Sequence, residues 1–166
     1  MLKIILELLN KFFRRKKVFK KEKIVINKSK DINFHTQRNN KIYPLEACGP
    51  TSMAMALIQA GHTNWQRNKK QAGDDIIASF LTTRRAYKRM EAMVGKNTNW
   101  KPFNIHRILS WGVNELLEKK VSNFGTTWDL KEILFNVLNG GGAVLVGDFT
   151  LESGRELGHI VSLAGF

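Results

Sequence analysis

The chain has 166 residues and a hydrophobic content of 43%, which suit one domain with a packed core and exclude disorder throughout. Its single cysteine, Cys48, excludes an intramolecular disulfide and a zinc finger or ribbon, which need several thiolates. The formal net charge of +13 favours anionic partners such as nucleic acid, acidic lipid or cell-wall polymer.

The N-terminal arm, residues 1–33, is predicted to be a basic amphipathic helix followed by a linker. Residues 1–23 hold nine of the 27 Lys and Arg residues but only two of the 14 Asp and Glu residues. Apolar residues recur at helical spacing on one face of residues 2–13: Leu2, Ile5, Leu6, Leu9, Phe12 and Phe13. Such a helix either lies on an anionic membrane surface through residues 1–23 or packs within the protein or an oligomer.

Targeting signals are not recognisable in this arm. Glu7 interrupts the apolar run and most of the positive charge follows it, which is not the order of a cleavable signal peptide. No run of about 20 apolar residues predicts a transmembrane helix. We therefore expect a cytoplasmic or peripheral membrane location.

The remaining residues, 34–166, are predicted to run from helices to strands. A strand or loop is expected near residues 32–37, and a loop over residues 38–47. Helices are expected over residues 50–60, 72–94, 103–118 and 128–138, ended in two places by Gly61 and Gly140–Gly142. Strands are expected over residues 121–124, 143–149 and 160–163, with a polar loop at 151–156. Helices followed by strands indicate an α+β fold.

Cys48 stands where a loop meets a helix. Gly49 and Pro50 follow the thiol at once, and Pro is favoured in the first turn of a helix because its missing N–H has no partner there. Free N–H groups and the positive end of the helix dipole favour the thiolate, which is the nucleophilic form of cysteine. The sequence therefore predicts a nucleophile at a helix tip.

His159 and Gln37 complete the predicted catalytic set. His159 lies in the β-like segment 157–163 and would take the proton from Cys48 and return it to the leaving group. The side-chain amide of Gln37 and the N–H of Cys48 would stabilise the oxyanion of the tetrahedral intermediate. Acyl transfer by such a set needs no cofactor and no metal, and none is predicted.

Two blocks of sequence resemble the C39-like cysteine peptidases of papain-like fold. The first contains Gln37 and the run Cys48-Gly49-Pro50-Thr51-Ser52-Met53-Ala54-Met55. The second contains Trp128-Asp129-Leu130, Gly142-Ala143-Val144-Leu145-Val146 and Gly158-His159-Ile160-Val161, in the family's order. The resemblance covers residues 34–166 and implies a helical half with the thiol on a helix tip and a C-terminal antiparallel sheet bearing the histidine. It implies a cysteine peptidase acting on peptides or on cell-wall peptide cross-links, as in a phage-type endolysin.

The chain departs from this family after His159. Such enzymes carry an Asp or Asn beyond the histidine strand to orient the imidazole, and residues 160–166 contain neither. The resemblance therefore implies a domain that is incomplete at its C-terminus, another orienting residue, for which Asp148 is a candidate, or an activity that is weak or lost.

Three rival interpretations remain open. The chain is a catalytically inactive relative that binds without cleaving, or it binds nucleic acid or membrane through residues 1–23, or it is a transferase with the same thiol and imidazole. No recognition helix or aromatic-interleaved basic surface predicts a specific nucleic-acid site. The other polar and aromatic residues are interpreted as surface, core or cleft walls: His35, His62, His106, Trp65, Trp100, Trp111, Trp128 and the basic cluster Arg84, Arg85, Lys88 and Arg89.

Overall fold

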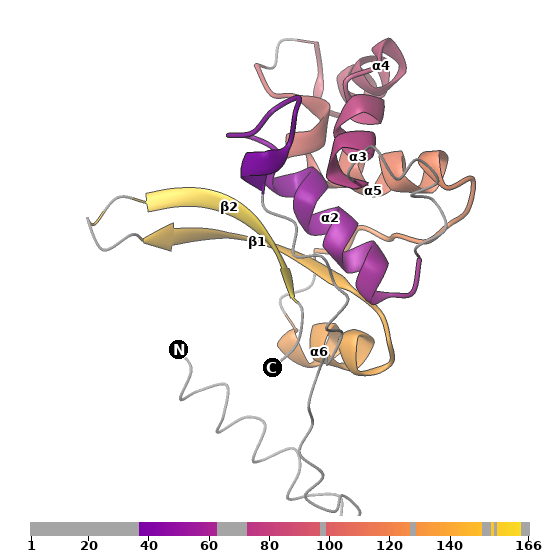
Figure 1. The fold of residues 1–166 in the computed structure, drawn as a ribbon, viewed down its shortest axis with the longest axis vertical. Coiled ribbons are helices and arrows are strands. Elements are labelled where there is room, and N and C mark those ends of the chain that lie inside the picture. The colour runs from indigo at the N-terminus through magenta and orange to yellow at the C-terminus, as the bar shows by residue number, and fades with distance from the viewer. Residues whose placement is uncertain are drawn as a thin grey trace, which may run out of the picture.

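A computed structural model of the chain describes residues 37–62, 73–96, 99–126, 129–150, 154 and 156–163. Within these residues the fold is α+β, as the sequence predicts: helices come first and a two-stranded antiparallel sheet follows (Figure 1). The predicted N-terminal helix and linker, and four of the six residues of the polar loop at 151–156, lie outside the described residues. No helix among those described is long and apolar enough to cross a membrane.

The helical part contains α2 (Cys48–Gln59), α3 (Gly73–Leu81), α4 (Arg84–Val94) and α5 (His106–Leu116), with 3-10 turns η1 (Gln37–Asn39) and η2 (Pro102–Asn104). Their apolar faces meet in one core, because each helix repeats its apolar residues at helical spacing. The largest fully buried apolar side chains of this core come from α3, η2 and α5: Ile77, Leu81, Phe103, Ile108, Leu109 and Val113.

Two sequence predictions for this part are wrong. The helix expected over residues 72–94 is two helices within the described residues 73–94, because Thr83 lies between them and caps the second: its hydroxyl donates to the carbonyl of Phe80 and accepts from the N–H of Ala86. Residues 121–124 form no strand. The Asn114 side chain accepts from the N–H groups of Val121 and Ser122 and donates to the Ser122 carbonyl, so a side chain satisfies this backbone instead of a neighbouring strand.

The sheet follows α6 (Leu130–Leu138), which Asp129 caps by accepting from the N–H of Lys131. Strand β1 (Ala143–Thr150) pairs with β2 (Glu156–Leu163), with Ala143 opposite Leu163 and Gly147 opposite His159. Strands β1 and β2 form a curved two-stranded ribbon that passes along α2 (Figure 1). Helix α6 lies on the other side of this ribbon from α4. The predicted strands at 143–149 and 160–163 are confirmed, and the second begins four residues earlier than expected.

Candidate active site

Cys48 is the first residue of α2, so the predicted helix begins two residues earlier than expected and includes the thiol. Ala47 precedes it and offers no side-chain cap, and Pro50 lies in the first turn and has no N–H. The main-chain bond from Thr51 N to the Ala47 carbonyl closes that first turn. The half-buried thiol therefore lies at a helix N-terminus whose amides are not capped by a side chain.

Strand β2 packs directly on this end of α2. The hydroxyl of Ser52 donates to the carbonyl of Ile160 over 2.9 Å, and both groups are buried. A Cβ placed on Gly49 would lie 3.3 Å from Cδ1 of Ile160 and 2.6 Å from the carbonyl oxygen of Phe103. These contacts join the residue after Cys48 to the residue after His159, so the two predicted catalytic residues flank one close contact.

Gly49→Ala is expected to lower the free energy of unfolding by about 1–3 kcal/mol, because the new methyl group would overlap the Phe103 carbonyl. Alanine otherwise favours a helix over glycine by about 1 kcal/mol, so a loss isolates the contact. Urea denaturation of Gly49→Ala and of a control, Gly125→Ala, which adds its methyl group in open space, measures the effect. A Gly49→Ala protein as stable as the Gly125→Ala protein would contradict the close approach of α2 to η2.

The register of the ribbon decides which face His159 occupies. Residues opposite each other in an antiparallel pair share a face, and successive residues alternate. His159 therefore shares a face with Gly147, while Ile160, whose side chain contacts the α2 segment, belongs to the other face. The other edge of β2 pairs with no second strand within the described residues.

The same register removes Asp148 as the residue that orients His159. Asp148 stands opposite Gly158, and a Cβ on Gly158 would lie 3.5 Å from Oδ1 of Asp148. The exposed Asp148 carboxylate thus lies on the face opposite to His159.

Gln37 begins η1, and its loop leads into α2 through consecutive turns. The Gln37 carbonyl accepts from the N–H of Asn40, and the Tyr43 carbonyl accepts from the N–H groups of Glu46 and Ala47. The side-chain oxygen of Asn40 accepts from two further N–H groups, those of Ile42 and Tyr43. A hydrogen-bonded path therefore connects the loop of the predicted oxyanion donor to the helix that carries the thiol.

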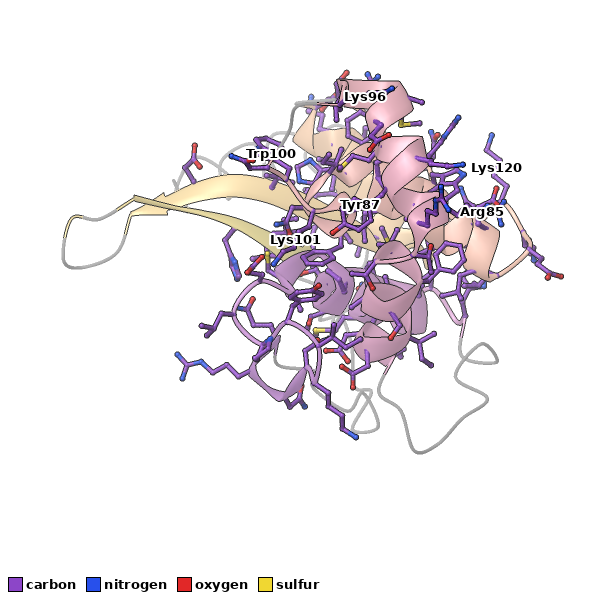
Figure 2. All side chains as sticks on the ribbon, turned by 90° about the horizontal axis from the view of Figure 1, so that it is seen from above. Arg85, Tyr87, Lys96, Trp100, Lys101 and Lys120 are labelled. Atoms are coloured by element: carbon purple, nitrogen blue, oxygen red, sulfur yellow. The ribbon has the colours of Figure 1, made fainter. Side chains whose placement is uncertain are left out.

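A cationic and aromatic group borders the same loop. Lys101 forms an ion pair with Glu46, with Nζ 2.6 Å from Oε2, and lies 4.2 Å over the ring of Tyr43. The neighbouring Leu45 and Trp100 are 82% and 63% exposed. In Figure 2 Trp100 and Lys101 lie toward the side from which the ribbon projects, whereas Arg85 and Lys120 lie at the other side of the helices. Trp111 instead packs against Phe80, with ring centroids 6.0 Å apart, and serves the core rather than a cleft.

No protein-family model, curated protein or solved structure matches this chain. The candidate site therefore rests on the residues and their arrangement alone.

Four polar residues that connect the loop from Gln37 to Ala47 (the Gln37 loop) with α2 and α3 were not predicted from the sequence: Asn40, Thr51, Asp74 and Asp75. All four are buried, and both aspartates lie in the first turn of α3. Two adjacent carboxylates at the start of an apolar helix were the available signal. Among the described residues, no three His, Cys, Asp or Glu side chains gather as a metal site.

His106, the first residue of α5, supplies a pH dependence of stability. Burial lowers the pKa of His106 below its ordinary value of 6.5, so the folded protein resists protonation of this imidazole more than the unfolded chain does. The free energy of unfolding should therefore fall as the pH drops from about 6.5 through the lowered pKa. Urea denaturation at about pH 7 and about pH 5 should show a smaller loss for His106→Gln than for the parent. An unchanged loss would assign the pH dependence to other groups.

Proposed function

We propose that this protein is a cysteine peptidase of papain-like fold, with Cys48 as nucleophile, His159 as general base and acid, and Gln37 as oxyanion donor. The single observation that carries the proposal is the packing of β2 on the first turn of α2, where Ile160 meets Gly49. A thiol on a helix tip and a histidine on an adjoining strand are the two parts that thiol acyl transfer needs.

The reaction would proceed in two steps at Cys48. His159 takes the thiol proton, and the thiolate attacks the carbonyl carbon of an amide. The oxyanion of the tetrahedral intermediate accepts hydrogen bonds from the Cys48 N–H and the Gln37 amide. Protonation of the amine by His159 releases it and leaves a thioester, which water hydrolyses with His159 again as base.

The surface supports peptides of an anionic bacterial cell wall as the substrate class. Leu45 and Trp100 present exposed apolar surface beside the loop that leads to Cys48. Arg84, Arg85, Lys88 and Arg89 form an exposed basic face of α4, and Arg85 lies on the other side of the helices from Trp100 (Figure 2). Such a face attracts anionic polymer by long-range electrostatics.

Digestion of purified peptidoglycan tests this function. The parent protein should release new free amino groups, because an amide is cleaved, without releasing new reducing sugar ends. Cys48→Ala should release neither, and a folded Cys48→Ala protein that still releases amino groups would contradict the nucleophile.

A catalytically inactive, papain-like binding module is the second candidate. The register favours it, because Asp148, the candidate for orienting the imidazole, lies on the opposite face of the ribbon from His159. In that case peptidoglycan should bind equally well to the parent and to Cys48→Ala, and neither should cleave it.

A further inference from the structure

Asp74 joins the two halves of the candidate site. Its Oδ2 accepts from the side-chain amide of Asn40 over 3.3 Å and from the hydroxyl of Thr51 over 3.2 Å. Asn40 lies three residues after Gln37, and Thr51 lies three residues after Cys48. One carboxylate oxygen therefore receives a donor from the Gln37 loop and a donor from the first turns of α2.

Asp75 adds a second tie to the same loop. Its Oδ1 accepts from the main-chain N–H of Lys41 over 2.8 Å, next to the Asn40 contact. Its Oδ2 is buried and has no hydrogen-bond partner among the described residues. Burying a carboxylate with few donors opposes stability, although the positive end of α3 reduces the cost. The stability of the fold therefore gives only a weak reason for an aspartate at position 75.

The Asn40 side chain connects Asp74 with the residues that follow in the loop. Its amide nitrogen donates to Asp74, and its oxygen accepts from the N–H groups of Ile42 and Tyr43. Tyr43 in turn accepts from Glu46 and Ala47, immediately before Cys48. The loop is thus tied to α3 at Asn40 and Lys41, and the Gln37 carbonyl joins it by accepting from the N–H of Asn40.

We propose that Asp74 and Asp75 are positioning residues, which hold the Gln37 amide at the distance from Cys48 that oxyanion stabilisation needs. This inference rests on the proposed function. It assigns a role in the reaction to two carboxylates that neither donate nor accept a proton in it.

Two reagents separate positioning from general damage. Iodoacetamide alkylates a thiolate by displacement at a saturated carbon, so no oxyanion forms. p-Nitrophenyl acetate acylates the same thiolate: sulfur attacks the ester carbonyl, an oxyanion forms, and its collapse makes the thioester and expels p-nitrophenolate. The ratio of the acylation rate to the alkylation rate of Cys48 therefore reports the oxyanion donors.

Asp74→Asn should lower this ratio on the order of 10- to 100-fold, since small displacements of a catalytic group cost that much. In a Gln37→Ala background the same substitution should leave the ratio unchanged, because the donor it positions is gone. Thr51→Val should act like Asp74→Asn, and Thr51→Ser, which keeps the hydroxyl, should restore the parent ratio. These Thr51 variants carry the test if Asp74→Asn fails to fold. Asp129→Asn, at the exposed cap of α6, serves as the matched control and should keep the parent ratio.

The outcomes distinguish the two proposals. If Gln37→Ala lowers the ratio but Asp74→Asn and Thr51→Val leave it at the parent value, the positioning role is overturned and the proposed function is not. Equal losses with and without Gln37 would also overturn it, because they indicate a general structural effect. A parent protein that p-nitrophenyl acetate does not acylate at Cys48 would overturn the proposed function and this inference together.

Discussion

His159→Ala is expected to slow acylation of Cys48 by p-nitrophenyl acetate by about 100-fold to 10,000-fold, the usual contribution of a general base. Without the imidazole, the thiol loses the group that takes its proton. His159 lies on β2 beside the contact between Ile160 and Gly49, so its removal leaves that contact in place. The burst of p-nitrophenolate from a known amount of protein measures the effect.

His62→Ala is the control for this substitution. His62 is another half-buried histidine, but it follows the C-terminal end of α2 rather than its tip. The acylation rate of Cys48 in His62→Ala should match that in the parent. Equal rates for parent and His159→Ala would remove His159 from the site and favour the inactive binding module.

Gln37→Ala is expected to slow acylation about 100-fold to 1,000-fold and to leave alkylation by iodoacetamide unchanged. The amide is one of two donors proposed for the oxyanion, and the loss of one such donor typically raises the barrier by about 2.7–4 kcal/mol. Rates with the two reagents, measured on the same preparation, separate this loss from damage to the thiol.

The neighbouring Arg38→Ala is the matched control for Gln37, because Arg38 lies exposed in the same 3-10 turn. It should retain both rates. Parallel losses of acylation and alkylation in Gln37→Ala would contradict an oxyanion role, since alkylation forms no oxyanion.

The sequence predicts correctly those helices and strands that are determined by residues within or next to them. Pro50 and the small apolar residues after it indicate α2, and the glycines at 140–142 indicate where β1 begins. The position of Cys48 at a helix tip followed from the same signals. Its burial and the approach of β2 did not, because Ser52 and Ile160 are 108 residues apart in the chain.

The failures have long-range or side-chain causes. The backbone at 121–124 looked like a strand by its apolar content, but Asn114 occupies its hydrogen bonds. The ties of Asp74 to Asn40 and Thr51 join residues 34 and 23 positions apart, and composition gives no indication of such pairings. The face of His159 depends on the strand register, which an expected strand over 160–163 left undefined.

The alkylation rate of Cys48 by iodoacetamide as a function of pH, in the parent and in His159→Ala, tests the central claim most directly. An ordinary thiol reacts slowly below its usual pKa of about 8.5, whereas a thiol paired with imidazolium stays reactive at about pH 5–6. We expect fast alkylation of the parent at about pH 6 that disappears in His159→Ala. Slow alkylation of both proteins at that pH, rising together toward about pH 8.5, would contradict a catalytic pair of Cys48 and His159.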